Sequence, residues 1–124
     1  EALRIVRINN NKVLCAGTEA ILDIGPRTVK IFSEIIAQAR TIFWNGPMGV
    51  FEDFDFSKGT EEIAKAIAQS NGFSVIGGGD TEGVVPRFKL EGKFGHVSTG
   101  GGASLAVLAG IELPVLKYLK EGLN

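Results

Sequence analysis

The chain has 124 residues, of which 44% are hydrophobic and 22% are charged, and its formal net charge is −1. This is the profile of one ordinary globular domain with a sizeable core. The near-zero charge and the lack of a basic block argue against nucleic acid as a main partner. No apolar run in these residues is long enough to span a membrane, and we expect no signal peptide. A single cysteine, Cys15, precludes an internal disulfide and suits a reducing compartment, so we expect a cytoplasmic protein.

The first predicted elements are two strands, over residues 3–8 and 12–17, joined as a hairpin at three asparagines. Cys15 lies in the second strand and is expected to pack as a small apolar residue. Residues 25–40 predict a helix, with Pro26 at the first helical position. The expected buried stripe of this helix is spaced at helical intervals; its members are Val29, Phe32, Ile35, Ile36 and Ala39.

Further along, strands and helices alternate. The apolar run at 41–44 predicts a buried strand, and residues 59–72 predict a helix that Thr60 caps and Gly72 ends in a left-handed conformation. Its apolar stripe consists of Ile63, Ala64, Ile67 and Ala68. A strand at 73–77, a short helical segment, a strand at 95–98 and two helices at 101–110 and 113–122 complete the chain. His96 opens the last strand, where a hydrogen-bonded core position is expected.

This order predicts an α/β fold in which a parallel sheet carries helices on both faces, a Rossmann-like three-layer arrangement. Short apolar strands are typical of a sheet that is covered on both sides. No linker or repeat divides residues 1–124 into two domains.

Three glycine clusters follow apolar runs: Gly46 with Gly49, residues 77–79, and residues 100–102. All three are expected at the carboxyl ends of strands, where ligands bind to sheets of this kind. A helix that starts directly after glycines offers free N–H groups to an anion, and phosphate is the common one. Asp80 beside such a site suggests a bridging magnesium ion, and the Thr81 hydroxyl suits a phosphate oxygen. Glu52, after the first cluster, suits paired sugar hydroxyls.

Turn geometry alone also explains glycines between strands and helices, and for a single cluster that explanation is the simpler one. Three clusters at equivalent positions favour binding instead. The chain has no Walker-type phosphate loop, no serine nucleophile elbow and no metal-binding spacing of histidine and cysteine.

Several segments, taken together and in order, closely resemble phosphoglycerate kinase, in the late part of its C-terminal, nucleotide-binding domain. They are LDIGP at 22–26, WNGPMGVFE at 44–52, GT at 59–60, IGGGDT at 76–81 and HVSTGGGASL at 96–105. The likeness runs from about Leu22 to Leu119, with residues 21–124 family-like and a weakly matching strand segment at 1–20. It implies phosphoryl transfer between 1,3-bisphosphoglycerate and ADP, giving 3-phosphoglycerate and ATP, with Mg²⁺ as cofactor.

The resemblance also implies roles for particular residues. Glu52 would hold the ribose hydroxyls, and Val50 and Leu22 would line the base and sugar. The nucleotide pocket would be shaped by Asn45, Gly46 and Pro47. Mg²⁺ would bind Asp80, and the phosphates would contact Gly78, Gly79 and Thr81. The transferring phosphoryl group would meet the N–H groups of Gly100, Gly101 and Gly102.

Two positions depart from the family pattern: Ile21 replaces a glycine near the adenine, and Pro86 lies inside the short helix after Asp80. The family's N-terminal domain, which binds the phosphoglycerate, and the upstream part of the nucleotide domain are not in this sequence. We therefore expect a fragment that is inactive alone. One alternative is a stand-alone, non-catalytic nucleotide- or phosphate-binding module, and another is a structural fragment that assembles through its open sheet edge.

Overall fold

The computed structural model describes residues 8–9, 12–13 and 20–122. Near its start, β1 (Ile8–Asn9) pairs antiparallel with β2 (Lys12–Val13), and Ile8 is opposite Val13. This confirms the predicted hairpin at the asparagines. The remainder of the two predicted strands, with Cys15, lies outside the described residues.

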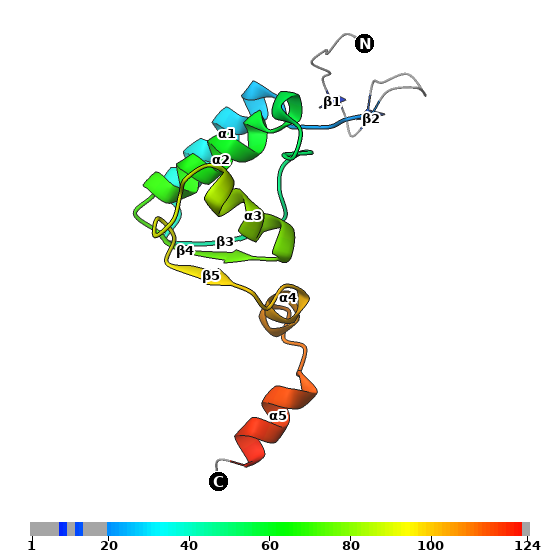
Figure 1. Ribbon diagram of the computed structural model, residues 1–124, viewed down its shortest axis with the longest axis vertical. Helices are drawn as coiled ribbons and strands as arrows, with labels where there is room; N and C mark the ends of the chain where they lie inside the picture. Colours follow the sequence, from blue (N-terminus) through cyan, green and yellow to red (C-terminus); the bar gives the residue numbers. More distant parts are fainter. Residues whose placement is uncertain (1–7, 10–11, 14–19, 123–124) are drawn as a thin grey trace.

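Three parallel strands form the central sheet, in the order β3 (Thr41–Asn45), β4 (Phe73–Gly77) and β5 (His96–Ser98). β4 and β5 lie within the predicted runs at 73–77 and 95–98, and β3 extends the predicted run at 41–44 by one residue, Asn45. Figure 1 shows α1 (Pro26–Gln38), α2 (Lys58–Gln69) and α3 (Gly79–Arg87) on one side of this sheet. In that view α4 (Gly102–Leu108) lies on the other side, and α5 (Pro114–Glu121) extends away from the sheet. The predicted α/β class and parallel sheet are confirmed.

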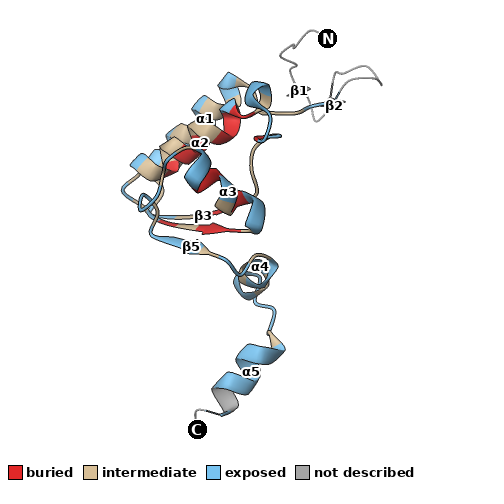
Figure 2. Ribbon diagram, viewed as in Figure 1, coloured by how far each residue is buried: buried red, intermediate tan, exposed pale blue. Residues whose placement is uncertain are grey.

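The core lies between the sheet and the three helices, where Figure 2 shows the buried residues gathered. Strand residues in register point to the same face, so Trp44 and Ile76 share the face that the helices cover. Ile76 and Val84 are completely buried. The buried members of this cluster are Trp44, Phe51, Ile63, Ala64, Ile67, Ile76, Val84 and Val85.

The opposite face of the sheet is only partly covered within the described residues. Phe73 on β4 is 58% exposed, and His96, the first residue of β5, is also exposed. The prediction of a core position for His96 is therefore wrong. Its strand has three residues and lies at the edge of the described sheet, so strand position alone did not ensure burial.

The amphipathic pattern predicted the position of α1 correctly, but the buried stripe that it predicted is largely exposed. Pro26 starts the helix as expected, yet no residue of α1 is buried, and Phe32 and Ile35 are 41% and 61% exposed. Ile36, by contrast, packs against the core. The helix packs mainly against α2, so only the part of its apolar stripe that faces α2 and the core is covered.

The start and end of α2 differ from the prediction. The helix begins at Lys58, one residue before the predicted start, and Thr60 lies inside it rather than capping it. Its end is at Gln69, and Gly72 does not have a positive φ. Glycine is needed at position 72 for space, because a Cβ atom there would overlap the Ala39 carbonyl oxygen. The predicted buried stripe is confirmed at Ile63, Ala64 and Ile67.

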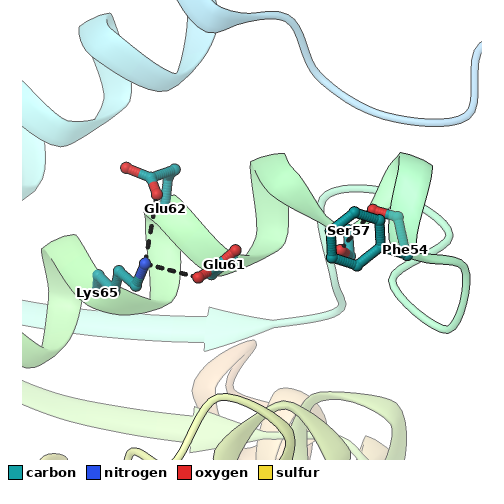
Figure 3. Close-up of polar contacts among 5 residues, drawn as sticks. All are labelled: Phe54, Ser57, Glu61, Glu62 and Lys65. Carbon is teal, nitrogen blue, oxygen red and sulfur yellow. Dashed lines mark hydrogen bonds and ion pairs between the residues drawn. The ribbon is translucent and has the colours of Figure 1, made fainter.

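Figure 3 shows polar contacts just before the start of α2 and farther along this helix. The Ser57 hydroxyl donates to the Phe54 carbonyl oxygen at 3.0 Å, closing the short 3₁₀ helix η1 (Phe54–Phe56) against the helix start. Farther along, Lys65 Nζ lies 2.6 Å from Glu61 Oε1 and 3.5 Å from Glu62 Oε1. The hydrogen bond to Glu61 raises the pKa of Lys65 above its usual 10.5.

Pro86 is the eighth of the nine residues of α3, and the helix ends at the next residue. Proline has no N–H to donate within a helix and disfavours its continuation, so the end of α3 at Arg87 agrees with the position of Pro86. None of the helices in the described ranges is long and apolar enough to cross a membrane.

Candidate functional site

The glycine-rich turns lie at one edge of the sheet. Asn45, Gly77 and Ser98 are paired across β3, β4 and β5, and each is the last residue of its strand. The chain therefore leaves all three strands at the same level. The prediction that the three clusters share the carboxyl edge of the sheet is confirmed.

The loop after β3, residues 46–50, is held by hydrogen bonds from alternate N–H groups. Gly46 N donates to Thr81 Oγ1 at 2.6 Å, and Met48 N donates to Thr60 Oγ1 at 3.0 Å. Val50 N donates to the Leu22 carbonyl oxygen at 2.9 Å. The three acceptors belong to α3, α2 and the segment before α1, so the loop is fixed to three separate parts of the fold.

The last residue of β3 touches the first residue of the turn after β4. Gly78 has a φ of +96°, and a Cβ atom at this position would lie 2.7 Å from Asn45 Nδ2. Glycine is thus required at position 78 both for its backbone conformation and for the approach of the Asn45 side chain. Asn45 and Gly78, two residues predicted to bind nucleotide, lie side by side.

The N-terminus of α3 carries both an acidic and a buried polar residue. Gly79 and Asp80, the first two residues of the helix, are exposed. Negative charge is favourable at this end of a helix dipole. Thr81 is completely buried, and its hydroxyl accepts the Gly46 N–H. Its side chain therefore contacts the neighbouring loop, whereas the sequence suggested a contact with phosphate.

Glu52 is exposed, two residues beyond the loop, and lies close to the last residue of α3. Arg87 Nη2 donates to the Glu52 carbonyl oxygen at 3.2 Å, and its guanidinium group lies 5.8 Å from the centre of the Phe51 ring. The sequence alone indicated no role for Arg87 at the site. Its contact with Glu52 joins positions that are 35 residues apart, and no local pattern indicates it.

The third turn, residues 99–101, leads into α4. Gly101 has a φ of +47° and precedes the first residue of the helix, Gly102. Gly100 N donates to Ser98 Oγ at 3.2 Å, and Ser98 Oγ lies 2.7 Å from Ser104 Oγ. Ser98 thus links the end of β5 to both the turn and the helix.

Asp23 fixes the start of α2 next to the site, and the sequence alone indicated no role for this residue. One carboxylate oxygen accepts the Ile24 N–H at 2.8 Å, and the other accepts the Gly59 N–H at 2.7 Å. Gly59 is the second residue of α2, so Asp23 caps that helix from a distant segment. The sequence shows an aspartate within LDIGP, but it does not indicate that this aspartate is bonded to Gly59.

The described residues contain no group of three or more metal-binding side chains of the histidine, cysteine or carboxylate type. A magnesium ion at Asp80 would therefore have to take most of its ligands from phosphate and water. Two surface hollows lie elsewhere, one lined by residues of α1 and its end and one around the start of α5. Neither includes a predicted site residue.

The sequence model of the family described as phosphoglycerate kinase matches residues 4–111. The matched range reaches into the first twenty residues, where a weak likeness was expected. Among curated proteins, the phosphoglycerate kinase of Rubrobacter xylanophilus is 57% identical over 100 residues, covering 81% of this chain. That of Buchnera aphidicola is 50% identical over 106 residues, covering 86%. These alignments cover 26% and 27% of the relatives, so the chain spans about a quarter of their length.

Solved structures give the same result. Phosphoglycerate kinase from Coxiella burnetii matches with a TM-score of 0.77 and 46% identity, over 82% of this chain and 26% of that one. The enzyme from Pyrococcus horikoshii matches with a TM-score of 0.74 and 46% identity, over 89% and 25%. The family match extends over most of the sequence and the fold agrees with that of solved members, so the chain belongs to the phosphoglycerate kinase family.

Proposed function

We propose that this chain forms the nucleotide-binding part of a phosphoglycerate kinase. The whole enzyme would transfer a phosphoryl group between 1,3-bisphosphoglycerate and ADP, giving 3-phosphoglycerate and ATP. One observation carries the proposal: in a chain of this family, the glycine-rich turns leave β3, β4 and β5 at one level, at Asn45, Gly77 and Ser98. That edge is where parallel α/β sheets bind ligands.

The nucleoside would bind along the loop that follows β3. Val50 is 44% exposed and its N–H is bonded to Leu22, so the two residues offer an adjacent apolar contact for the base and sugar. Glu52 follows with an exposed carboxylate, which suits the two ribose hydroxyls. Asn45, Gly46 and Pro47 would shape the pocket on the other side.

The phosphates would bind at the start of α3. The first N–H groups of a helix have no partner within it, so those of Gly79, Asp80 and Thr81 are available to an anion. Gly78 permits close approach of the phosphate to the backbone. Because the Thr81 hydroxyl is buried against Gly46, we assign this residue a backbone contact with phosphate. The Asp80 carboxylate would hold Mg²⁺, which neutralises phosphate charge when it is bound.

The transferring group would lie toward residues 100–102. The N–H groups of Gly100, Gly101 and Gly102 would stabilise the charge that spreads over its oxygens, which is the main demand of phosphoryl transfer. The second substrate needs a binding surface of its own, which the proposal assigns to the N-terminal domain of the family. A cytoplasmic location also remains a prediction.

Calorimetry with Mg-ADP on the 124-residue chain tests nucleotide binding. Glu52→Ala should weaken Mg-ADP binding about tenfold or more, the effect of losing one hydrogen bond to a charged group, and leave inorganic phosphate binding unchanged. Glu91→Ala removes an exposed glutamate far along the chain and serves as the matched control. Equal losses for ADP and phosphate would contradict the ribose assignment.

Asp80→Asn tests the magnesium assignment. The side chain is exposed, so the fold should persist, while the gain in ADP affinity on adding Mg²⁺ should disappear. Asp55→Asn, at another exposed aspartate, controls for the change of charge. A gain from Mg²⁺ that survives in Asp80→Asn would refute this role.

A kinase assay separates the proposal from the alternative of a non-catalytic binding module. The chain alone should give no turnover with ATP and 3-phosphoglycerate, because transfer requires both substrates in line and a site closed to water. Adding the complementary N-terminal part of a relative should restore some activity, and Asp80→Asn should abolish it. If the chain alone gives turnover and Asp80→Asn abolishes it, the two substrate sites are not divided between this chain and the N-terminal domain as proposed. Failure of every complementary part to restore turnover would favour the binding module.

A further inference from the structure

The loop at residues 46–50 has no regular secondary structure of its own, and its shape depends on the hydrogen bonds that alternate N–H groups donate. The acceptor at one end is Thr81, beside the proposed phosphate site, and the acceptor at the other end is Leu22, beside the proposed base site. The middle N–H, that of Met48, is bonded to Thr60. Nothing in the proposed nucleotide contacts includes Thr60.

Thr60 is completely buried, so it does not reach any ligand at the surface. It is the third residue of α2, and its hydroxyl accepts the N–H of a residue outside that helix. The helix start itself is fixed by Asp23, which accepts the neighbouring Gly59 N–H. The Thr60 hydroxyl therefore has a fixed place in the fold, and the loop is positioned against it.

We propose that Thr60 is a positioning residue for nucleotide binding: through the Met48 N–H, its buried hydroxyl holds the loop in the shape that presents Val50 and Glu52 to the nucleoside. This inference rests on the proposed function. A loop that is held in one shape before binding loses less conformational freedom when the ligand arrives, so its affinity is higher. Without the hydroxyl, the Met48 N–H has no acceptor and the loop opens more readily.

The central variant is Thr60→Val, which keeps the shape of the side chain and removes the acceptor. Thr60→Ser keeps the acceptor and removes a methyl group. Ser74→Ala is the matched control, because Ser74 is also buried and its hydroxyl accepts a backbone N–H, that of Gly95 at 3.2 Å. Ser74 lies near the start of β4, away from the proposed site.

Two readouts decide the matter: amide hydrogen exchange at Met48, measured by NMR, and calorimetric affinity for Mg-ADP. In Thr60→Val, we expect faster exchange at Met48 and affinity lowered by about five- to tenfold, the usual range for one hydrogen bond. Thr60→Ser should resemble the unsubstituted chain in both. Ser74→Ala should lose stability yet keep the Met48 exchange rate and the Mg-ADP affinity.

The inference would be overturned if Thr60→Val folds and binds Mg-ADP with the same affinity as the unsubstituted chain. An equal loss of affinity in Ser74→Ala would also overturn it, since this would point to general destabilisation. If Thr60→Val does not fold, Thr60→Cys replaces it, because a thiol is similar in size but a weak acceptor. An unsubstituted chain that does not bind Mg-ADP would instead refute the proposed function itself, and the role of Thr60 in binding with it.

Discussion

Gly59 provides a sharp test of how the site is supported. It is buried in the first turn of α2, and its N–H is bonded to the Asp23 carboxylate. An added Cβ would lie 2.5 Å from Ile24 Cγ1 and 3.0 Å from Asp23 Cγ, and closer still to Asp23 Oδ1. Gly59→Ala must therefore displace the side chains of Asp23 and Ile24, within LDIGP.

Two effects of opposite sign compete in Gly59→Ala. Alanine favours a helix over glycine by about 1 kcal/mol. Overpacking costs about 1–3 kcal/mol, and loss of a hydrogen bond to a charged group costs about 1.5–3 kcal/mol. The clash should prevail, with a net loss of about 2–4 kcal/mol in the free energy of unfolding. Urea denaturation followed by circular dichroism measures it.

Gly83→Ala is the matched control for this prediction. Gly83 lies in the middle of α3 and is exposed, and a Cβ there would meet Phe51 Cζ at an ordinary 3.5 Å. Helix propensity should then act alone and raise stability by about 0.5–1 kcal/mol. If Gly59→Ala is as stable as the unsubstituted chain, then Asp23 and Gly59 do not pack as described.

Two further substitutions test the packing of the core and the ion pair on α2. Ile76→Ala should lower the free energy of unfolding by about 2–5 kcal/mol because Ile76 is completely buried between sheet and helices, and a loss below about 1 kcal/mol in urea denaturation would mean that the core is placed wrongly. Lys65→Gln should cost only about 0.3–0.5 kcal/mol at pH 7, since the Lys65 side chain is 43% exposed and solvent screens the pair. The folded-state pKa of Lys65 is raised, so this contribution is fully present below 10.5 and is lost as the pH rises through the folded-state pKa. Urea midpoints of the two proteins should therefore converge above that pH, and a gap that widens there would contradict the assignment.

The parts of the fold that follow from local pattern were predictable. β3 and β4 are apolar runs that end at glycine-rich turns, and the α2 stripe at Ile63 and Ile67 has helical spacing. The alternation of strand and helix was enough to indicate a parallel sheet and to place the three turns at one edge. These features depend on residues close together in the sequence.

The contacts that hold the site were not predictable in the same way. The bond from Gly59 to Asp23 joins residues 36 apart, and the bond from Gly46 to Thr81 joins residues 35 apart. Thr60 was expected to cap its own helix because threonine commonly does so, but Asp23 takes that role and leaves the Thr60 hydroxyl for the loop. Burial of the outer part of α1 and of His96 depends on what packs against them, which their spacing does not specify.

An NMR titration of the 124-residue chain with Mg-ADP shows whether the carboxyl edge of the sheet binds a magnesium nucleotide. We predict amide shift changes in residues 45–52, 78–81 and 99–102, with the surfaces of α1 and α5 unchanged. Replacing ADP by inorganic phosphate should keep the changes at 78–81 and lose those near Val50 and Glu52. Changes concentrated on α1 or α5, or no changes at millimolar Mg-ADP, would contradict this prediction.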